Sequence, residues 1–284
     1  MAEANPTARQ RELSRRLRTL REQRNLTVNL VAEQLLCSAT KISRIETAKR
    51  RASLRDIRDL CQFYEVSEAE TAQLMELGRG ARETAWWTDY GDLGVGVGPY
   101  LGLEQEAKAI TYYSMSFVNG LLQTEAYARA IIRATHPLMD DQTLKERVEA
   151  RLRRQDLLEG TDRPRVRVLL DESVLRRQVG GHETMTAQLD KILQIVSQEK
   201  ATIQVVPFSA GAQASTESNF TLFDYAVLPS ILHVEGLLGD HIRDQPAVVE
   251  RYSEVLDHLR DTALSPRDSQ VLITEIRDAH QGSS

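Results

Sequence analysis

The sequence predicts a mainly α-helical chain, α+β overall, in which an N-terminal five-helix domain precedes a larger mixed α+β domain. Three observations support this fold class. Short amphipathic helical segments follow one another over about 80 residues, glycines and tryptophans then interrupt the pattern, and strand-like segments alternate with helices in the remainder. A length of 284 residues fits two domains at roughly 150 residues each. We therefore divide the chain into residues 1–82, a linker over 83–103, and residues 104–284.

The first helix is indicated by Leu13, Leu17 and Leu20, whose spacing of four and three places them on one face. Each later helix of this domain is expected to follow a residue whose hydroxyl accepts from the free amides of its first turn. These capping residues are Thr27, Ser38, Ser53 and Ser67. The spacing from Thr27 to Ser38 predicts a short helix, a tight turn and another helix within some 20 residues.

The helix after Ser38 is predicted to bury one face and expose a polar one. Ile42 and Ile45 face inward, as do Leu30, Val31 and Leu35 of the helix before it. The outward side chains are then short, polar or basic. They are Ala39, Thr40, Lys41, Ser43 and Arg44. A helix exposing such side chains near its N-terminus can enter the major groove of DNA and bond to base edges.

Charge is divided unevenly along the chain. Residues 1–66 contain 14 Lys or Arg and eight Asp or Glu, a net charge of +6, so the rest of the chain carries −11 of the total of −5. A basic N-terminal domain suits a polyanion, although solvated helix faces produce similar runs of charge. The charge therefore agrees with DNA binding without establishing it.

Residues 13–64 resemble the helix-turn-helix of lambda-repressor-like, Cro-type (XRE) transcriptional regulators. The resemblance rests on Ala32 where two helices cross, on Leu35 in the core, on Ser38 opening the recognition helix, and on the string from Ile42 to Glu46. It implies that residues 38–44 enter the major groove. The sequence departs from the family pattern at three positions. Leu36 and Ala48 replace glycines, and Val28 replaces a commonly polar phosphate-contacting residue.

Two kinds of DNA contact are expected from this domain. Lys41 and Arg44 are the main candidates for reading guanine, with Thr40 and Ser43 beside them, and pairing of Arg44 with Glu46 or with a phosphate stays open. The remaining predicted DNA-binding residues contact the sugar-phosphate backbone or cap the helices near it. They are Thr27, Ser38, Lys49, Arg50 and Arg51.

The linker contains Trp86 and Trp87, the only tryptophans of the chain, and several glycines. Gly94, Gly96 and Gly98 suggest a dinucleotide fingerprint, which we reject because no strand precedes them, no regular helix is expected after Pro99, and the G-x-G-x-x-G spacing is absent. Packing of the connector on the second domain is the expected role of the tryptophans. A ligand or partner pocket formed by Trp86, Trp87 and Tyr127 remains the alternative.

The second domain is predicted to contain both helices and strands. The segment from Leu103 indicates two helices broken near Asn119 and Gly120, and further helices are expected over about 142–159, 184–198 and, as the last one, 247–263. Four strands are indicated by alternating apolar residues. They lie in the segments RVRVLLDE, ATIQVVPF, FTLFDY and ILHVE.

This second domain also resembles a known group. The order of EAKAI, NGLLQTEAYARAI, RLRRQDLL, LLDESVLRRQVGG, IQVVPF, FTLFDY and ALSPRDS is similar to the domain of unknown function behind the helix-turn-helix of WhiJ-like, antitoxin-like regulators of actinobacteria. Asn119 stands where those proteins often have proline. The resemblance implies a regulator of development or specialised metabolism, often encoded beside a small partner protein, and assigns no ligand.

No pattern in the sequence indicates an enzyme. The six histidines form no H-E-x-x-H motif, and neither a G-x-S-x-G nor a phosphate-binding glycine loop is present. His233, Glu235, Asp240 and His241 are the best metal-like group, but their spacing fits no metal template. We therefore expect no catalytic residue, no metal and no cofactor.

Composition limits where the protein acts. Hydrophobic residues at 41% and charged residues at 27% exclude a collagenous or wholly disordered chain, and no apolar run approaches the ~18 residues of a membrane span. The N-terminus lacks the apolar stretch of a secretory signal, and Cys37 and Cys61 are too few for a disulfide framework. We expect a cytoplasmic protein with reduced cysteines.

These features together predict a sequence-specific DNA-binding regulator, a homodimer on a palindromic operator, modulated through its C-terminal domain. Two alternatives stay open. One is an antitoxin-like interaction module that sequesters a small partner protein, and the other is a small-molecule sensor. The sequence gives neither the operator nor the direction of regulation, and it names no effector.

Overall fold

The computed structural model describes residues 7–80, 86–91, 93–94, 96–213, 218–236 and 240–282. The chain divides into two compact units. Met1–Thr88 and Gly98–Glu106 form most of the first unit, and Ala107–Ala226 and Ser230–Ser284 form most of the second. None of the helices in the described residues is long and apolar enough to cross a membrane.

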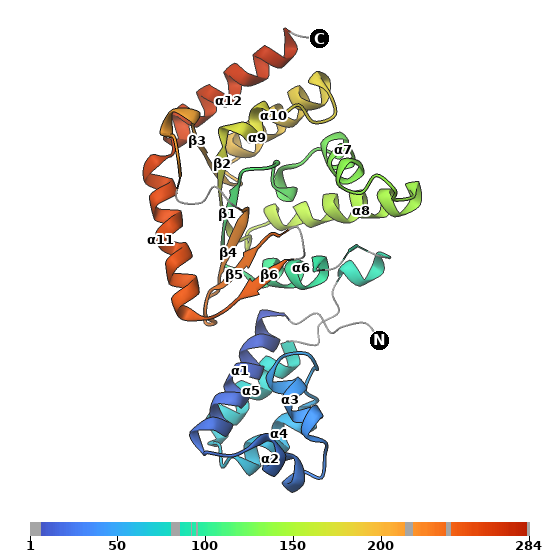
Figure 1. Ribbon diagram of the computed structural model, residues 1–284, viewed down its shortest axis with the longest axis vertical. Helices are drawn as coiled ribbons and strands as arrows, with labels where there is room; N and C mark the ends of the chain where they lie inside the picture. Colours follow the sequence, from blue (N-terminus) through green and yellow to red (C-terminus); the bar gives the residue numbers. More distant parts are fainter. Residues whose placement is uncertain are drawn as a thin grey trace. The chain divides into compact units, whose positions relative to one another are not determined.

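Five short helices form the body of the first unit, as predicted (Figure 1). They are α1 (Ala8–Gln23), α2 (Val28–Gln34), α3 (Ala39–Glu46), α4 (Leu54–Phe63) and α5 (Glu68–Gly80). The predicted caps are confirmed, because the hydroxyls of Thr27, Ser38, Ser53 and Ser67 each accept a hydrogen bond from the amide three residues on. Capping satisfies amides that have no partner within the helix, so these hydroxyls set where each helix begins.

The core of the five helices contains most of the expected apolar residues. Leu13, Leu17 and Leu20 of α1 pack with Ile42 and Ile45 of α3, and all five are buried. Leu30 is an exception, since 41% of its surface is exposed. The expectation that Leu30 faces inward is wrong because α2 has only two turns, and its inward positions are taken by Val31 and Ala32.

Two elements of the predicted linker belong to the first unit. They are η1 (Trp86–Asp89), of which Trp86 to Thr88 lie in this unit, and α6 (Val97–Glu106). The expectation that no regular helix follows Pro99 is wrong, since proline is tolerated in the first turn of a helix, where its missing amide needs no partner. Gly102 of α6 lies against the ring of Trp87. A Cβ added at Gly102 would stand 3.5 Å from a carbon of that ring.

A six-stranded sheet is the centre of the second unit. Its strands, in the order β3-β2-β1-β4-β5-β6, run parallel from β3 to β1 and antiparallel from β1 to β6. They are β1 (Ala109–Ser114), β2 (Arg165–Asp171), β3 (Thr202–Val206), β4 (Phe220–Asp224), β5 (Ile231–Val234) and β6 (His241–Arg243). The four predicted strands are present. The segment forming β1 was expected to be helical, which is wrong, because its β-branched and aromatic residues pair with strands on both sides.

Helices cover the sheet, with α11 along one face and α7 and α8 on the other side (Figure 1). The main helices are α7 (Glu125–Thr135), α8 (Asp141–Arg153), α9 (Glu172–Arg176), α10 (His182–Ser197), α11 (Pro246–Thr262) and α12 (Pro266–Gln281). The short turns are η2 (Gly120–Leu122), η3 (Arg154–Leu158) and η4 (Phe208–Ala210). Leu256 and Leu259 of α11 pack on Tyr113, Leu169 and Phe220. α11 was predicted as the last helix, and α12 corrects this.

Candidate nucleic-acid interface

Helix α3 presents the polar face that the sequence predicts. Ile42 and Ile45 are buried beneath it, while Thr40, Ser43 and Arg44 are exposed. The Ser38 hydroxyl accepts from the Lys41 amide at 3.2 Å and fixes the start of the helix. The face contains two hydroxyls and one guanidinium, all hydrogen-bonding groups that can reach base edges.

A buried ion pair holds the C-terminal end of α3. Arg21 of α1 donates to both carboxylate oxygens of Glu46, at 2.8 and 2.9 Å, and to the carbonyl of Leu26 at 2.8 Å. The hydrogen bonds to Glu46 raise the pKa of Arg21 above its ordinary value, although partial burial opposes the change. Such a bidentate pair fixes geometry as well as charge. Glu46 is therefore engaged by Arg21, and no bond joins it to Arg44, the partner left open from the sequence.

A second ion pair involves Lys41, one of the two predicted base-reading residues. Its ammonium lies 2.5 Å from Oδ1 of Asp56 on α4. Asp56 also accepts from the Ser53 amide in a capping box at the start of α4. Burial alone would raise the pKa of Asp56, but the hydrogen bonds from Lys41 and Ser53 outweigh it and hold that pKa below its ordinary value. In the free protein, Lys41 thus joins α3 to α4.

The guanidinium of Arg44 is exposed and has no hydrogen bond or ion pair to any residue that the structure describes. Lys49, Arg50 and Arg51 after the helix are exposed as well. Their loop is held by its backbone, because the Arg50 amide donates to the Arg44 carbonyl at 2.9 Å. The Gln10 side chain also donates to the carbonyl of Ala48 at 3.0 Å. Four cationic side chains are therefore available on an ordered segment.

The helix-turn-helix turn contains an unusual residue. Leu36, which stands where the family has glycine, adopts a left-handed conformation with φ of 49°, and 95% of its surface is exposed. Ala48 has φ of 56° after α3, again where the family has glycine. Both positions favour glycine, so these two turns carry backbone strain. At the other end of α2, the Thr27 hydroxyl caps the helix.

The alternative pocket proposed from the sequence draws on both units, since Trp86 and Trp87 lie in the first unit and Tyr127 lies in the second. The two tryptophan rings form an edge-to-face pair with centroids 5.7 Å apart. Tyr127 is completely buried in the core of the second unit, and its hydroxyl accepts from the Val118 amide at 3.1 Å. Its side chain has no surface that a ligand could reach from solvent.

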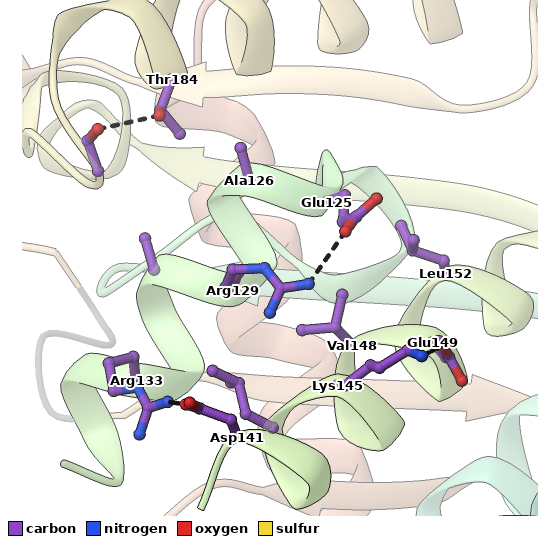
Figure 2. Close-up of a pocket in the computed structure, with 13 residues that line it drawn as sticks. Glu125, Ala126, Arg129, Arg133, Asp141, Lys145, Val148, Glu149, Leu152 and Thr184 are labelled. Carbon is purple, nitrogen blue, oxygen red and sulfur yellow. Dashed lines mark hydrogen bonds and ion pairs between the residues drawn. The ribbon is translucent and has the colours of Figure 1, made fainter.

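A different hollow lies on the second unit, between α7, α8 and the start of α10 (Figure 2). This α7–α8 groove has a volume of about 870 Å³. Its apolar lining includes Ala126 and Ala130 of α7 and Leu144, Val148 and Leu152 of α8. Ion pairs line its rim, from Arg129 to Glu125, Arg133 to Asp141 and Lys145 to Glu149. Sequence patterns do not indicate this groove, because its lining residues come from separate helices that only the fold brings together.

The fold brings only part of the metal-like group considered from the sequence together. Nε2 of the buried His233 lies 3.2 Å from Oδ2 of Asp240, while Glu235 accepts from the Asn219 amide group at 2.8 Å. His241 is exposed on β6. Within the described parts of the chain, no three His, Cys, Asp or Glu side chains are arranged to hold a metal ion.

Two family models match the chain, one in its N-terminal part and one in the larger part that follows. Residues 12–74 match a family model described as a helix-turn-helix domain, and residues 97–275, more than half of the chain, match one described as Domain of unknown function (DUF5753). No curated protein matches the chain. No solved structure matches it either.

Proposed function

Since the chain belongs to the DUF5753 family and carries a DNA-binding helix-turn-helix domain, we propose that it is a transcriptional regulator that reads a specific operator as a dimer and is modulated through its second unit. The observation that carries the proposal is the exposed polar face of α3, whose apolar face and C-terminal end are held by the core and by Arg21. A reading helix must be rigid, because a mobile one would lose binding energy to ordering on DNA.

In this proposal Arg44 reads a guanine. A guanidinium can donate to both O6 and N7 of guanine, and this pairing contributes about 1–3 kcal/mol of discrimination against the wrong base. Arg44 is favoured over Lys41 because the ammonium of Lys41 already bonds Asp56. Thr40 and Ser43 contact neighbouring bases, and Lys41 positions α3.

Lys49, Arg50 and Arg51 are proposed to contact phosphates. Phosphate contacts fix the register of a protein on the duplex and carry no sequence information of their own. Thr27 and Ser38 belong to the same proposed interface, since the N-termini of α2 and α3, which they cap, offer amides to phosphate oxygens.

Dimerisation is proposed on energetic grounds. One helix-turn-helix unit makes a small interface, whereas two units related by a two-fold axis read half-sites about 10 bp or a multiple apart. Analytical ultracentrifugation of the full chain with operator tests this, and a complex with one chain per operator would contradict it.

The test of sequence reading begins with genome-wide mapping of bound DNA, which supplies the operator. Fluorescence anisotropy at physiological salt then compares operator and scrambled duplexes. Equal affinity of the full chain for the two would contradict specific regulation. We expect Arg44→Ala to weaken operator binding about 5- to 150-fold, corresponding to 1–3 kcal/mol, and to change binding of the scrambled duplex little.

Arg79→Ala is the matched control, since Arg79 is an exposed arginine on α5 of the same unit. It should bind both duplexes as the unchanged chain does. An equal loss on both duplexes in Arg44→Ala would instead identify Arg44 as a phosphate contact.

A second candidate function is the antitoxin-like capture of a small partner protein, and the α7–α8 groove favours it. An amphipathic helix can place its apolar face in such a groove. Ala130→Leu should fill the groove and abolish a stoichiometric complex isolated from the native cell, while Ala134→Leu, on the same helix but outside the groove, should not. A complex that survives Ala130→Leu, or a chain isolated alone, would contradict this function.

A further inference from the structure

One corner of the sheet in the second unit lies beyond the apolar cluster that α11 covers. The helix follows β6 in the chain, and the segment after it reaches the far edge of the sheet, where the Leu264 amide donates to the Val205 carbonyl of β3 at 2.8 Å. Its buried residues pack on the part of the face formed by Tyr113, Leu169 and Phe220. The starts of β1, β2 and β3 on the same face lie outside this apolar cluster.

The register of the strands brings four polar side chains together in this corner. Arg167 of β2 is paired with Thr111 of β1 on one side and with Thr202 of β3 on the other. Paired positions lie roughly 5 Å apart across a sheet. Arg165 precedes Arg167 by two residues, so it is on the same face about 7 Å along the strand. Leu169, two residues after Arg167, packs under α11, so Arg165 and Arg167 point to the same face. Thr111 and Thr202 are paired with Arg167 and therefore share that face.

The donors of this group lack acceptors. Nε of Arg167 is buried and has no hydrogen-bond partner among the described residues. Within the same ranges, neither Arg165 nor Arg167 forms an ion pair, and neither threonine hydroxyl has a hydrogen bond. A buried donor without an acceptor is costly, and native proteins rarely keep one without a reason. Several arginines of this unit are paired with carboxylates, among them Arg129, Arg133 and Arg277.

We propose that Arg165, Arg167, Thr111 and Thr202 form a binding site for the phosphate group of a small molecule. Two guanidinium groups and two hydroxyls offer several donors and two positive charges to one anion. A phosphate carries close to two negative charges and three acceptor oxygens near neutral pH, so it uses this set more fully than a carboxylate does. The nearest acid in the register, Asp224, is separated from Arg165 by β1 and accepts from the Ser230 hydroxyl.

The site deepens the proposed function, because it gives the modulated unit a class of effector. The effector role of the site rests on the proposed function, but the binding of phosphate does not, since it can be measured without DNA. Failure of the DNA-binding tests would therefore leave this proposal intact, and the reverse also holds.

The experiment measures the thermal midpoint of the full chain in inorganic phosphate, in acetate and in chloride at one ionic strength. At a phosphate concentration ten times its dissociation constant, we expect a rise of about 2–5 °C over chloride, and little rise in acetate. Arg167→Met, which keeps the apolar stem, should abolish the rise, and Arg165→Met should reduce it. Arg251→Met is the matched control, since Arg251 is an exposed, unpaired arginine on α11 of the same unit, and it should retain the rise.

Two further experiments distinguish this site from phosphate binding at the helix-turn-helix and from binding of the DNA backbone at the corner. The double variant Arg50→Met, Arg51→Met should retain the phosphate effect, which excludes binding at the helix-turn-helix. Arg167→Met should bind operator DNA as tightly as the unchanged chain. Loss of DNA affinity in Arg167→Met would assign the corner to the DNA backbone and overturn the small-molecule site.

The proposal is also overturned if phosphate gives no rise over chloride, or if Arg167→Met keeps it. Should Arg167→Met fail to fold, the exposed Arg165→Met carries the same test by titration calorimetry with inorganic phosphate. Binding unchanged in that variant would then contradict the site.

Discussion

At the scale of single residues, the basic segments of the first unit contain charges with two different tasks. Arg21 and Lys41 bond to Glu46 and Asp56, whereas Arg44 is exposed. From the sequence all of these cations suit DNA, and Lys41 was predicted to read bases. Its partner Asp56 is 15 residues away, so only the packing of α3 on α4 brings the two together. Capping residues such as Ser38 are predictable because their partners lie three residues away.

The Lys41–Asp56 pair predicts how the stability of the chain depends on pH. Because the pKa of Asp56 is lower in the folded chain than its ordinary value of 3.8, its carboxylate stabilises the fold above that value, and the contribution is lost as the pH falls through the lower, folded pKa. The difference in unfolding free energy between the unchanged chain and Asp56→Asn should therefore be constant above about pH 5 and shrink below pH 4.

Urea unfolding at a series of pH values measures this difference. Asp59→Asn, at a half-exposed position of the same helix, is the control and should show less dependence on pH. A difference that stays constant down to pH 2 would contradict the role given to the pair.

At the scale of elements, the turn between α2 and α3 carries strain that a single change can relieve. Leu36 has φ of 49°, and its side chain makes almost no contact, since 95% of its surface is exposed. A left-handed conformation costs a residue with a Cβ roughly 1–2 kcal/mol, and glycine avoids this cost. Glycine also makes the unfolded chain more flexible, which offsets part of the gain in stability. Leu36→Gly should therefore raise the unfolding free energy by about 0.5–1 kcal/mol.

Urea unfolding of Leu36→Gly checks this expectation. Asn29→Gly, inside α2, should instead lower the unfolding free energy, because glycine there only weakens the helix. A decrease in Leu36→Gly would show that its side chain has contacts outside those of the described structure.

The turn η2 and the residues that follow it are held by side chains from α10 and η3. Gln188 of α10 donates to the Leu122 carbonyl at 2.7 Å and accepts from the Thr124 amide at 2.8 Å. Gln155 and Lys191 both donate to the Gln123 carbonyl, and burial lowers the pKa of Lys191. The resemblance to a known family pointed to this segment, but its partners lie more than 30 residues away and follow from the fold alone.

Gln188→Leu tests this network, because it keeps the volume and removes both hydrogen bonds. Two backbone groups would lose their partners, at about 1–3 kcal/mol each, so the unfolding free energy should fall by about 2–6 kcal/mol. Gln194→Leu, exposed on the same helix, should change it by less than about 0.5 kcal/mol. Equal effects of the two changes in a thermal melt would contradict the importance of the network.

The elements that sequence patterns missed have a common cause. β1 was predicted as helix because its neighbours in the chain are helical, while its true partners, β2 and β4, begin more than 50 and 100 residues later. β6 has three residues, too few to show an alternation. Helices of the first unit were predictable because caps and apolar spacing are local. Strand pairing depends on contacts distant in sequence, which periodicity does not report.

At the scale of the whole molecule, the division of charge determines how binding responds to salt. Residues 1–66 carry +6 and the rest −11, so long-range attraction to DNA belongs to the first unit alone. Each phosphate contact releases counterions, and the logarithm of the binding constant falls with the logarithm of salt concentration with a slope of about −0.9 per contact.

This relation predicts the number of chains on the operator as well as the role of the loop after α3. Replacing Arg50 and Arg51 by Met removes two proposed phosphate contacts from each chain. The slope should become shallower by about 3.6 if two chains bind one operator and by about 1.8 if one does. Anisotropy titrations between roughly 50 and 300 mM salt resolve the two values. We expect the larger change. Arg79→Met should leave the slope as it is, and a double variant with an unchanged slope would remove Arg50 and Arg51 from the interface, because a side chain that neutralises no phosphate releases no ions.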